Sequence, residues 1–362
     1  MSNVHEHKST VRISKGVTPP SYSEKAQQQF KKKRQYSADE YLKGILNSNR
    51  IMLSQAITLV ESSLPEHQNL AQDIIEKCLP YSGKSIRIGI TGVPGAGKSS
   101  FIEALGTMLT SDGHRIAVLA IDPTSERSKG SIMGDKTRME NLAKDQHAFI
   151  RPSPSAGTLG GVAKKTRETI ILCEAAGFDT IFVETVGVGQ SETAVRSMVD
   201  FFLLLMLAGA GDELQGIKRG IIEMADVVAI TKADGTNTRK AEQAKAAYTG
   251  ALHLFPPAES GWTPKVVTCS AFRKTGIGEI WNIIAEYREL TVLNGYFSKK
   301  RKEQSLYWMY ETINQNLKEN FYNNGGIKKL LARYEKKVLK DEVSSFMAAR
   351  LLLKKYHSKQ SG

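Results

Sequence analysis

A glycine-rich segment that ends in a lysine and a serine is the strongest chemical signal in the sequence. It fits the pattern G-x-x-x-x-G-K-[ST], between an apolar stretch at residues 86–91 and a helical pattern at residues 100–109. In that setting glycines let backbone N–H groups turn toward phosphates, and the helix that follows adds its positive end. The segment therefore predicts a loop that binds the phosphates of a nucleotide.

Two side chains of this loop have distinct expected roles. Lys98 should neutralise the β- and γ-phosphates, and the Ser99 hydroxyl should ligate Mg²⁺. The residues expected to bind the nucleotide in this segment are Gly92, Val93, Pro94, Gly95, Ala96, Gly97, Lys98, Ser99 and Ser100.

A second motif indicates which base the nucleotide carries. Thr231-Lys232-Ala233-Asp234 resembles the N-K-x-D motif that selects guanine in GTPases, with Thr in place of the usual Asn. A carboxylate at Asp234 can accept from the N1–H and the 2-amino group of guanine, whereas adenine lacks that donor pair. The stem of Lys232 can lie over the base, and the substitution at Thr231 puts one orienting hydrogen bond in question.

A shorter element supports the same base assignment. Ser270-Ala271 follows Cys269 at the end of another apolar stretch and resembles the S-A-x element of GTPases, whose backbone N–H meets the guanine O6. Each motif is weak alone, but together with the phosphate loop they predict a guanine nucleotide site for GTP or GDP.

Three carboxylates stand at or near the ends of predicted strands, where ligands bind in parallel sheets. Asp122 closes one apolar stretch, and Glu184 opens the tetrapeptide Glu184-Thr-Val-Gly187, which resembles the second switch of GTPases. We expect Asp122 and Glu184 to help hold Mg²⁺ and the Gly187 N–H to meet the γ-phosphate. Asp135 lies in a polar segment, residues 123–138, that resembles a first switch loop.

No residue is an obvious base for activating water. Gln190 and Glu192 follow the second switch and are candidates for orienting it, but position alone does not show this. Phosphoryl transfer depends mainly on positioning and charge neutralisation, so hydrolysis is still expected, with slow turnover for the protein alone.

The pattern of apolar stretches predicts how these motifs are positioned. Strand-like stretches alternate with helical ones, which predicts an α/β P-loop NTPase fold with a mostly parallel central sheet flanked by helices. The stretches expected to be strands are residues 86–91, 115–121, 180–184, 201–207, 227–231 and 265–269. Helical patterns precede and follow this region, and the expected division is a disordered basic tail at 1–35, a helical region at 36–84, the GTPase domain at 85–290 and a C-terminal helical extension at 291–362.

Charge is concentrated at the two ends of the chain. The formal net charge is +13, yet residues 1–35 contribute +6 and residues 298–362 contribute +9, which leaves the middle at −2. The predicted enzymatic region is therefore near neutral, and solvated helix faces and a solvated tail account for the excess more simply than a nucleic-acid partner does. An anionic protein or nucleic acid remains the alternative for the two ends.

Other features bear on where the protein works. No apolar run approaches the roughly 20 residues of a membrane helix, and the N-terminus lacks the pattern of a secretory signal. The three cysteines are far apart and odd in number, so no disulfide framework follows. A reducing cytoplasm without membrane attachment is the expected location.

The motifs and the loops between them resemble one family, the methylmalonyl-CoA mutase-associated GTPases (MeaB-like), also labelled ArgK or LAO/AO transport ATPases. The resemblance covers roughly Tyr41 to Leu290 and is looser beyond. The most specific stretches are Asp122-Pro-Thr-Ser, Gly130-Ser-Ile-Met-Gly-Asp-Lys-Thr-Arg138, Arg151-Pro-Ser-Pro-Ser-Ala-Gly-Thr-Leu-Gly-Gly161, Val183-Glu-Thr-Val-Gly-Val-Gly-Gln-Ser-Glu192 and Gly209-Ala-Gly-Asp-Glu-Leu-Gln-Gly-Ile-Lys218.

The resemblance implies a homodimer held by the C-terminal helices. It also implies a chaperone for an adenosylcobalamin-dependent acyl-CoA mutase, one that gates cofactor delivery and protects the mutase. Residues 209–218 would then be a third switch that senses the mutase, with Gln215 and Lys218 reaching toward the nucleotide. The residues that the resemblance assigns to nucleotide and metal are Lys98, Ser99, Asp122, Asp135 and Glu184.

Three other functions remain open at this stage. A GTPase that delivers a metal ion would need a Cys/His cluster, and only His5 and His7 have suggestive spacing. A kinase or transport-coupled ATPase fits the family's older label, but Lys232 and Asp234 speak against ATP. A nucleotide-gated interaction module with negligible turnover would differ from a working GTPase in single-turnover hydrolysis.

Overall fold

The protein is described by a computed structural model that covers residues 36–121, 139–152, 159–185, 191–208 and 219–358. Contacts divide the chain into two units, Met1–Ser37 and Ala38–Gly362, and every described helix and strand belongs to the second. None of the described helices is both long and apolar enough to cross a membrane.

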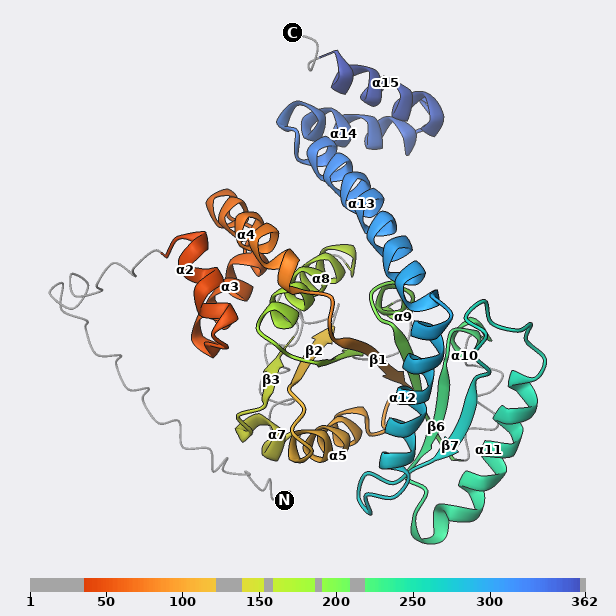
Figure 1. Ribbon diagram of the computed structural model, residues 1–362. Coiled ribbons are helices and arrows are strands. Elements are labelled where there is room, and N and C mark those ends of the chain that lie inside the picture. Colours follow the sequence, from red (N-terminus) through yellow and green to blue (C-terminus); the bar gives the residue numbers. More distant parts are fainter. Residues whose placement is uncertain (1–35, 122–138, 153–158, 186–190, 209–218, 359–362) are drawn as a thin grey trace, which may run out of the picture. The chain divides into compact units, whose positions relative to one another are not determined.

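A seven-stranded sheet, parallel throughout, forms the centre of the second unit (Figure 1). Its strand order is β3-β2-β4-β1-β5-β6-β7. The strands are β1 (Ile86–Gly92), β2 (Ile116–Ile121), β3 (Ala148–Arg151), β4 (Thr180–Thr185), β5 (Phe201–Leu207), β6 (Val227–Thr231) and β7 (Lys265–Thr268). The α/β fold predicted from the sequence is confirmed, and the phosphate-loop strand β1 lies in the middle of the sheet.

The edge strand β3 was not among the predicted strands. It is only four residues long and pairs with β2 alone. Four residues are too few to show a period-two pattern, and Arg151 already carries a polar side chain. The remaining six strands lie where the apolar stretches predict them.

Helices cover both faces of the sheet. Within the sheet region they are α5 (Lys98–Ser111), α7 (Glu140–Lys144), α8 (Leu159–Ala175), α9 (Ser191–Arg196), α10 (Arg219–Glu223), the 3-10 turn η3 (Gly235–Asn237), α11 (Thr238–Leu252) and α12 (Ile277–Leu293). Successive strand residues point to opposite faces. On β1, a Cβ at Gly89 would meet Val195 of α9, whereas Ile88 and Ile90 belong to the core that includes Phe101 of α5.

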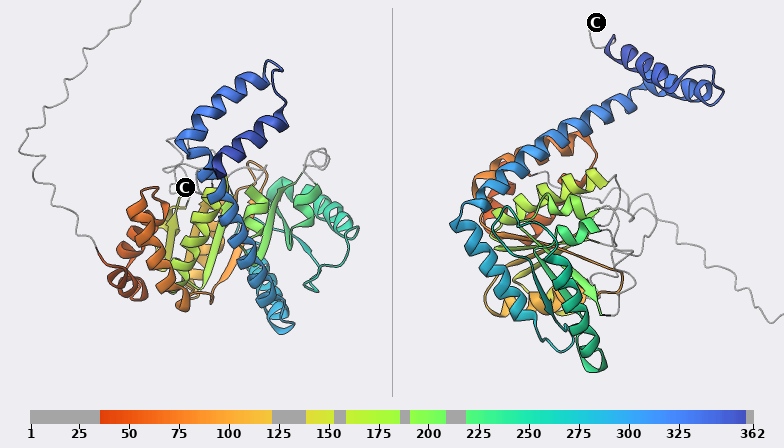
Figure 2. Two further views of the ribbon diagram at one scale, coloured as in Figure 1. Left: turned by 90° about the horizontal axis from the view of Figure 1, so that it is seen from above. Right: turned by 90° about the vertical axis from the view of Figure 1, so that its right-hand side faces the viewer.

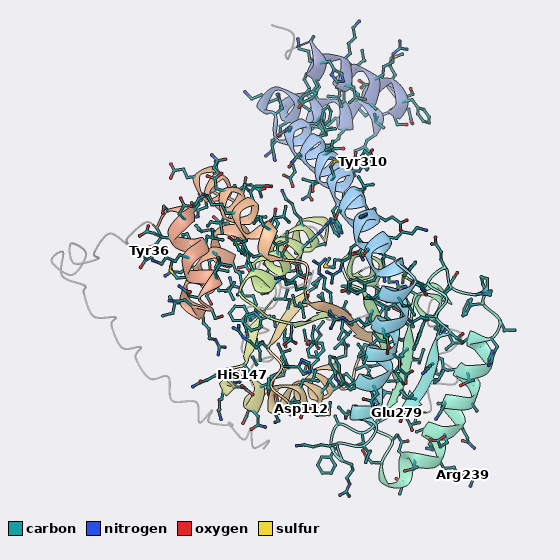
Figure 3. All side chains as sticks on the ribbon, in the orientation of Figure 1. Tyr36, Asp112, His147, Arg239, Glu279 and Tyr310 are labelled. Atoms are coloured by element: carbon teal, nitrogen blue, oxygen red, sulfur yellow. The ribbon has the colours of Figure 1, made fainter. Side chains whose placement is uncertain are left out.

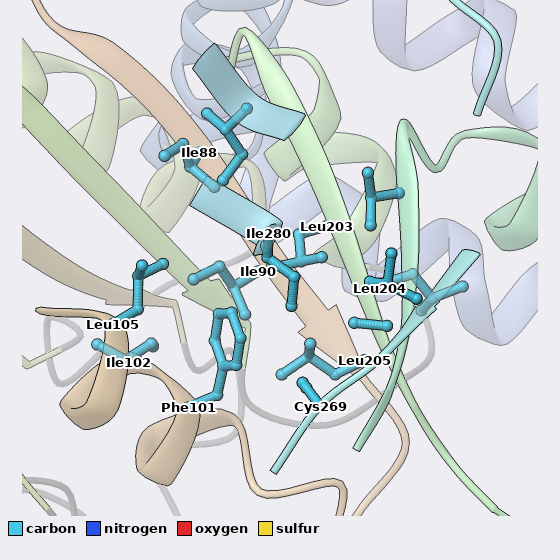
Figure 4. Packing of buried hydrophobic residues seen from close by; sticks show 14 of the residues in the cluster. Ile88, Ile90, Phe101, Ile102, Leu105, Leu203, Leu204, Leu205, Cys269 and Ile280 are labelled. Carbon is cyan, nitrogen blue, oxygen red and sulfur yellow. The ribbon is translucent and has the colours of Figure 1, made fainter. Parts of the chain in front are cut away.

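The core beneath the phosphate loop is apolar and well filled. Figure 4 shows Phe101 of α5, Ile280 of α12 and Leu203 of β5 converging with Ile90 of β1. All four are buried, with exposed fractions of 0 or 1%. Packing of this kind fixes the start of α5 relative to β1, and the phosphate loop joins those two elements.

Helices also precede and follow the sheet region. The first group is α2 (Ala38–Leu46), α3 (Arg50–Glu61), α4 (Pro65–Cys78) and the 3-10 turn η1 (Leu79–Tyr81), and α3 and α4 pack against α8. The second group is α13 (Tyr296–Asn323), α14 (Gly325–Val338) and α15 (Ser345–His357). Figures 1 and 2 show α14 and α15 side by side at the C-terminal end of α13.

A buried ion pair anchors α13 to the sheet region. Arg301 of α13 donates to both carboxylate oxygens of Asp200 (2.8 and 2.6 Å), and the backbone N–H of Arg87 donates to the same carboxylate. Burial by itself would raise the pKa of Asp200, but the hydrogen bond and charge of Arg301, together with Arg87, outweigh it and hold that pKa below its usual value. Lys300 and Gln304 donate to the carbonyls of Asp200 and Val199, so one turn of α13 is tied to the residues just before β5.

Candidate guanine nucleotide site

The loop between β1 and α5 has the backbone that phosphate binding requires. Gly95 and Gly97 have φ values of +78° and +81°, in the left-handed region that favours glycine. At the end of β1, a Cβ on Gly92 would lie 2.3 Å from the carbonyl oxygen of Leu205, a contact that no side chain tolerates. The sequence places glycine at the three positions where the loop needs it, and α5 then begins at Lys98.

The ammonium group of Lys98 reaches back to Gly92, the first residue of this loop. Its Nζ donates to the carbonyl oxygen of Gly92 (2.9 Å). Burial lowers the pKa of Lys98, and the nearby carboxylates of Glu184 and Glu192 partly offset that effect because they favour the charged ammonium. A half-buried ammonium is screened less by water than an exposed one, so it interacts more strongly with a phosphate group.

Ser99 and Glu184 come together although they are 85 positions apart. The Ser99 hydroxyl donates to Glu184 Oε1 (3.2 Å), and both side chains are buried, with exposed fractions of 8% and 4%. Their proximity follows from the sheet, since Glu184 on β4 pairs with Ile90 on β1. A hydroxyl and a carboxylate are hard oxygen donors of the kind that Mg²⁺ prefers, so the residues present fit this ion.

We predict that replacing Glu184 with glutamine weakens Mg²⁺ binding, so that hydrolysis requires a higher Mg²⁺ concentration. The amide keeps the shape of the side chain and still accepts from Ser99, but it lacks the negative charge that attracts a cation. The half-saturating Mg²⁺ concentration for phosphate release should rise by roughly tenfold, the effect of about 1.4 kcal/mol. A Mg²⁺ titration of Glu184→Gln that overlays the wild-type curve would remove Glu184 from the metal site.

A separate pocket of about 280 Å³ adjoins the phosphate loop. It lies at the carboxyl ends of β6 and β7, where ligands bind in parallel sheets. Its lining residues are Ala96, Gly97, Ser100, Phe101, Thr231, Lys232, Asp234, Cys269, Ser270, Ala271 and Phe272. The three motifs that the sequence identified separately therefore share one cavity.

The base-selecting residues are bonded to one another. The Ser270 hydroxyl donates to Asp234 Oδ2, and the Ala233 N–H donates to the Cys269 carbonyl (3.0 Å). The backbone of Lys232 has φ +55°, and Asn237 donates to its carbonyl (2.8 Å). These contacts join the loop that follows β6 to the loop that follows β7. The carboxylate of Asp234 therefore has a fixed position in the pocket.

Thr231, which stands where the motif usually has asparagine, contacts the phosphate loop through its hydroxyl. Its Oγ1 lies 2.8 Å from the carbonyl oxygen of Ala96 in the phosphate loop and 3.0 Å from that of Met206 in β5. One hydroxyl proton serves one of these acceptors at a time. The threonine therefore ties the base-selecting strand directly to the phosphate loop.

Six residues that the sequence analysis names for the site lie outside the described residues: Asp122, Asp135, Gly187, Gln190, Gln215 and Lys218. Their roles stay predictions. Asp122 and Gly187 follow within two residues of the ends of β2 and β4, at Ile121 and Thr185.

Two features of the site were not predicted. The hydroxyls of Thr91 and Thr185 lie 2.8 Å apart and are buried, which links β1 to β4 beside the phosphate loop. Phe272 lines the base pocket, and its position directly after Ser270-Ala271 was the available signal for it.

Comparison with known proteins identifies the family of the chain. Residues 53–325 match the family model described as methylmalonyl Co-A mutase-associated GTPase MeaB. A probable GTPase of Mycobacterium bovis is 46% identical over 317 residues, covering 88% of this chain and 94% of that protein. GTPase ArgK of Escherichia coli K12 is 46% identical over 285 residues, covering 79% of this chain and 86% of that protein.

Two further similarities have other names. The mitochondrial methylmalonic aciduria type A homolog of Mus musculus is 46% identical over 337 residues, covering 90% of this chain and 81% of that protein. A crystal structure described as an LAO/AO transport system kinase is 36% identical and superposes with a TM-score of 0.71, covering 88% of this chain and 97% of that one. The chain therefore belongs to the methylmalonyl-CoA mutase-associated GTPase MeaB family, and it is a GTPase with a guanine nucleotide site.

Proposed function

We propose that this GTPase is a chaperone for an adenosylcobalamin-dependent acyl-CoA mutase of the methylmalonyl-CoA mutase type, gating the loading of its cofactor and protecting it. The main support is that a pocket lined by the proposed base-selecting residues, with Asp234 bonded to Ser270, occurs in a chain of the MeaB family. The family's description names the mutase, and the mouse relative's name refers to methylmalonic aciduria.

Different residues of the site bind the phosphates, the base and the metal ion. Lys98 neutralises the β- and γ-phosphates, and the N–H groups of the phosphate loop surround them. Asp234 holds the base edge, and Ser99 and Glu184 would hold Mg²⁺, with Asp122 as a further proposed ligand. When bound, Mg²⁺ supplies positive charge beside the phosphates.

The topology of the sheet supports a nucleotide-dependent switch. Strands β4 and β5 lie on either side of β1 and end at Thr185 and Leu207. The proposed second switch, residues 184–187, begins at the end of β4, and the proposed third switch, residues 209–218, begins two residues after the end of β5. The two strands that flank the phosphate-loop strand therefore each lead into a segment that resembles a switch. A mutase that binds two arrangements of residues 209–218 unequally would change hydrolysis, and by linkage GTP would change mutase affinity.

Turnover measured with and without the cognate mutase tests this function. We expect the mutase to raise the rate of GTP hydrolysis, and Lys218→Ala to reduce that stimulation while GTP affinity stays nearly unchanged. The matched control is Lys84→Ala. It removes an exposed lysine just before β1, at the amino ends of the parallel strands.

The outcomes separate the parts of the proposal. Full stimulation in the Lys218 variant would exclude that residue from the coupling. If no adenosylcobalamin-dependent mutase of the source cell stimulates turnover or changes nucleotide affinity, the chaperone proposal fails and the GTPase assignment stands.

We also propose that the protein is a homodimer held by its C-terminal helices. Leu306, Tyr310, Ile313 and Leu317 recur along α13 at spacings of four, three and four residues, and each is about half exposed. Tyr310 is labelled on α13 in Figure 3. Such spacing forms one apolar stripe along a helix, as in a coiled-coil seam.

The mass in solution tests the homodimer. Sedimentation equilibrium should give twice the mass of the chain for the wild type, and Ile313→Glu should shift it toward the monomer. A wild-type protein that sediments as a monomer at micromolar concentration would contradict the proposal.

A cytoplasmic location is the last part of the proposal. Cys78, Cys173 and Cys269 are buried free thiols, and thiols persist in reducing compartments. Fractionation of the source cell tests this location, and recovery in a secreted or membrane fraction would contradict it.

A further inference from the structure

Phe272 is an exposed aromatic side chain at the guanine pocket. It lines the pocket, yet 83% of its surface is accessible to solvent, whereas Phe101 on the same pocket is buried. A large apolar ring that remains this exposed contributes little to the core. Its location beside Asp234 and Ser270 suggests that it contacts a ligand.

The loop that carries Phe272 is held in one conformation. Ser270 and Thr275 form a bridge in which each N–H donates to the other's carbonyl, at 2.9 and 3.1 Å. The N–H of Arg273 donates to the Ser270 hydroxyl (3.0 Å), the same hydroxyl that contacts Asp234. The position of the Phe272 backbone is therefore tied to the residue that reads the base.

The end of this loop also requires a glycine. Gly276 has φ +72°, and a Cβ there would lie 2.3 Å from the carbonyl oxygen of Thr268. The loop thus returns tightly against the end of β7 before α12 begins. A loop closed at both ends can present a side chain at its tip with little loss of entropy on binding.

A contact with Arg273 restricts the orientation of the Phe272 ring. The guanidinium carbon of Arg273 lies 5.4 Å from the centroid of the Phe272 ring, within the range of a cation–π contact. Arg273 can occupy only one face of the ring. The other face remains for a flat partner, and the pocket it borders is of the kind that a purine base fills.

We infer that Phe272 stacks on the purine base of the bound nucleotide, while Asp234 reads its edge. The inference deepens the guanine-site assignment and does not depend on the mutase. Stacking on an aromatic ring stabilises every base because each has a π face, and it is worth roughly 5- to 150-fold in affinity. Phe272 therefore sets the strength of purine binding and leaves the choice of purine to Asp234.

Dissociation constants of GDP and IDP for four proteins test this division. Hypoxanthine keeps the ring system and N1–H of guanine but lacks the 2-amino group. We expect Phe272→Ala to weaken GDP and IDP by the same factor, about 5- to 150-fold, and so to leave their ratio at the wild-type value. Phe272→Trp should retain wild-type affinity. The control is Tyr81→Ala, which removes an aromatic ring before β1, at the amino ends of the parallel strands. It should change neither dissociation constant.

A spectroscopic signal checks for direct contact. In Phe272→Trp, GDP should quench the added indole fluorescence beyond any change seen in the wild type, which has three tryptophans of its own. Unchanged GDP affinity in Phe272→Ala, or no added quenching in Phe272→Trp, would overturn the inference. A changed GDP:IDP ratio would instead assign Phe272 to edge recognition and overturn it as well. Equal binding of ADP and GDP by the wild type would sink the guanine site itself, which is a different result.

Discussion

GTP hydrolysis should fall by roughly 10³-fold when Lys98 is replaced by alanine, the loss expected when a fixed charge that stabilises a developing anion is removed. The ammonium of Lys98 is half-buried beside Gly92, whose carbonyl accepts its hydrogen bond, and charges in such surroundings are less screened than on the open surface. Water that enters the space of the lost side chain cannot replace an oriented cation. Single-turnover release of phosphate from saturating GTP measures the effect on the chemical step.

The control for Lys98→Ala keeps the change in net charge but moves it away from the site. Lys84→Ala removes an exposed lysine before β1 and should leave turnover unchanged. Circular dichroism melting of both variants confirms that each is folded. A folded Lys98→Ala protein that retains wild-type turnover would show that the phosphate loop is not the hydrolytic site.

Nucleotide preference should pass from guanine to xanthine when Asp234 is replaced by asparagine. Guanine offers two donors, N1–H and the 2-amino group, to the carboxylate. Xanthine offers one donor and one acceptor, which match the carbonyl and the NH₂ of an amide. Each mismatched bond to a charged group costs about 1.5–3 kcal/mol. Losing one for GDP and gaining one for XDP should change the ratio of their affinities by roughly 10²–10⁴-fold.

Calorimetry with GDP, XDP and ADP on both proteins measures this change. The Ser270 hydroxyl, which donates to Asp234, can still donate to the amide oxygen, so the pocket should keep its shape. Asp112→Asn is the matched control, since Asp112 is exposed and lies at the far end of α5, which Figure 3 shows. A GDP:XDP ratio that stays at the wild-type value would contradict the role of Asp234.

The same titration addresses the family's older label. That label raised the alternative of a kinase or transport-coupled ATPase, which would bind adenine nucleotides. If ADP binds the wild type as well as GDP does, that alternative gains support. Strong preference for GDP would leave the guanine-dependent chaperone as the better proposal.

The sequence alone predicted the chemistry of the site and determined the class of the fold. The phosphate loop, Asp234 and Ser270 were recognisable because short motifs encode local backbone needs, such as the left-handed glycines at Gly95 and Gly97. The alternation of apolar stretches with helical patterns predicted a parallel sheet, since buried parallel strands consist almost entirely of apolar residues. The edge strand β3, short and ending in Arg151, left no such pattern.

Tertiary structure decided which distant residues meet. Thr231 contacts Ala96 across 135 positions, and Ser99 contacts Glu184 across 85. These pairs form because the strand order places β4 and β5 beside β1 and β6 beside β5, and no local pattern encodes that order. The role inferred for Phe272 also needed the fold, because an aromatic residue after Ser270-Ala271 reads equally well as core. Its exposure at the mouth of the pocket is set by the closed loop around it, through backbone contacts that a sequence motif does not display.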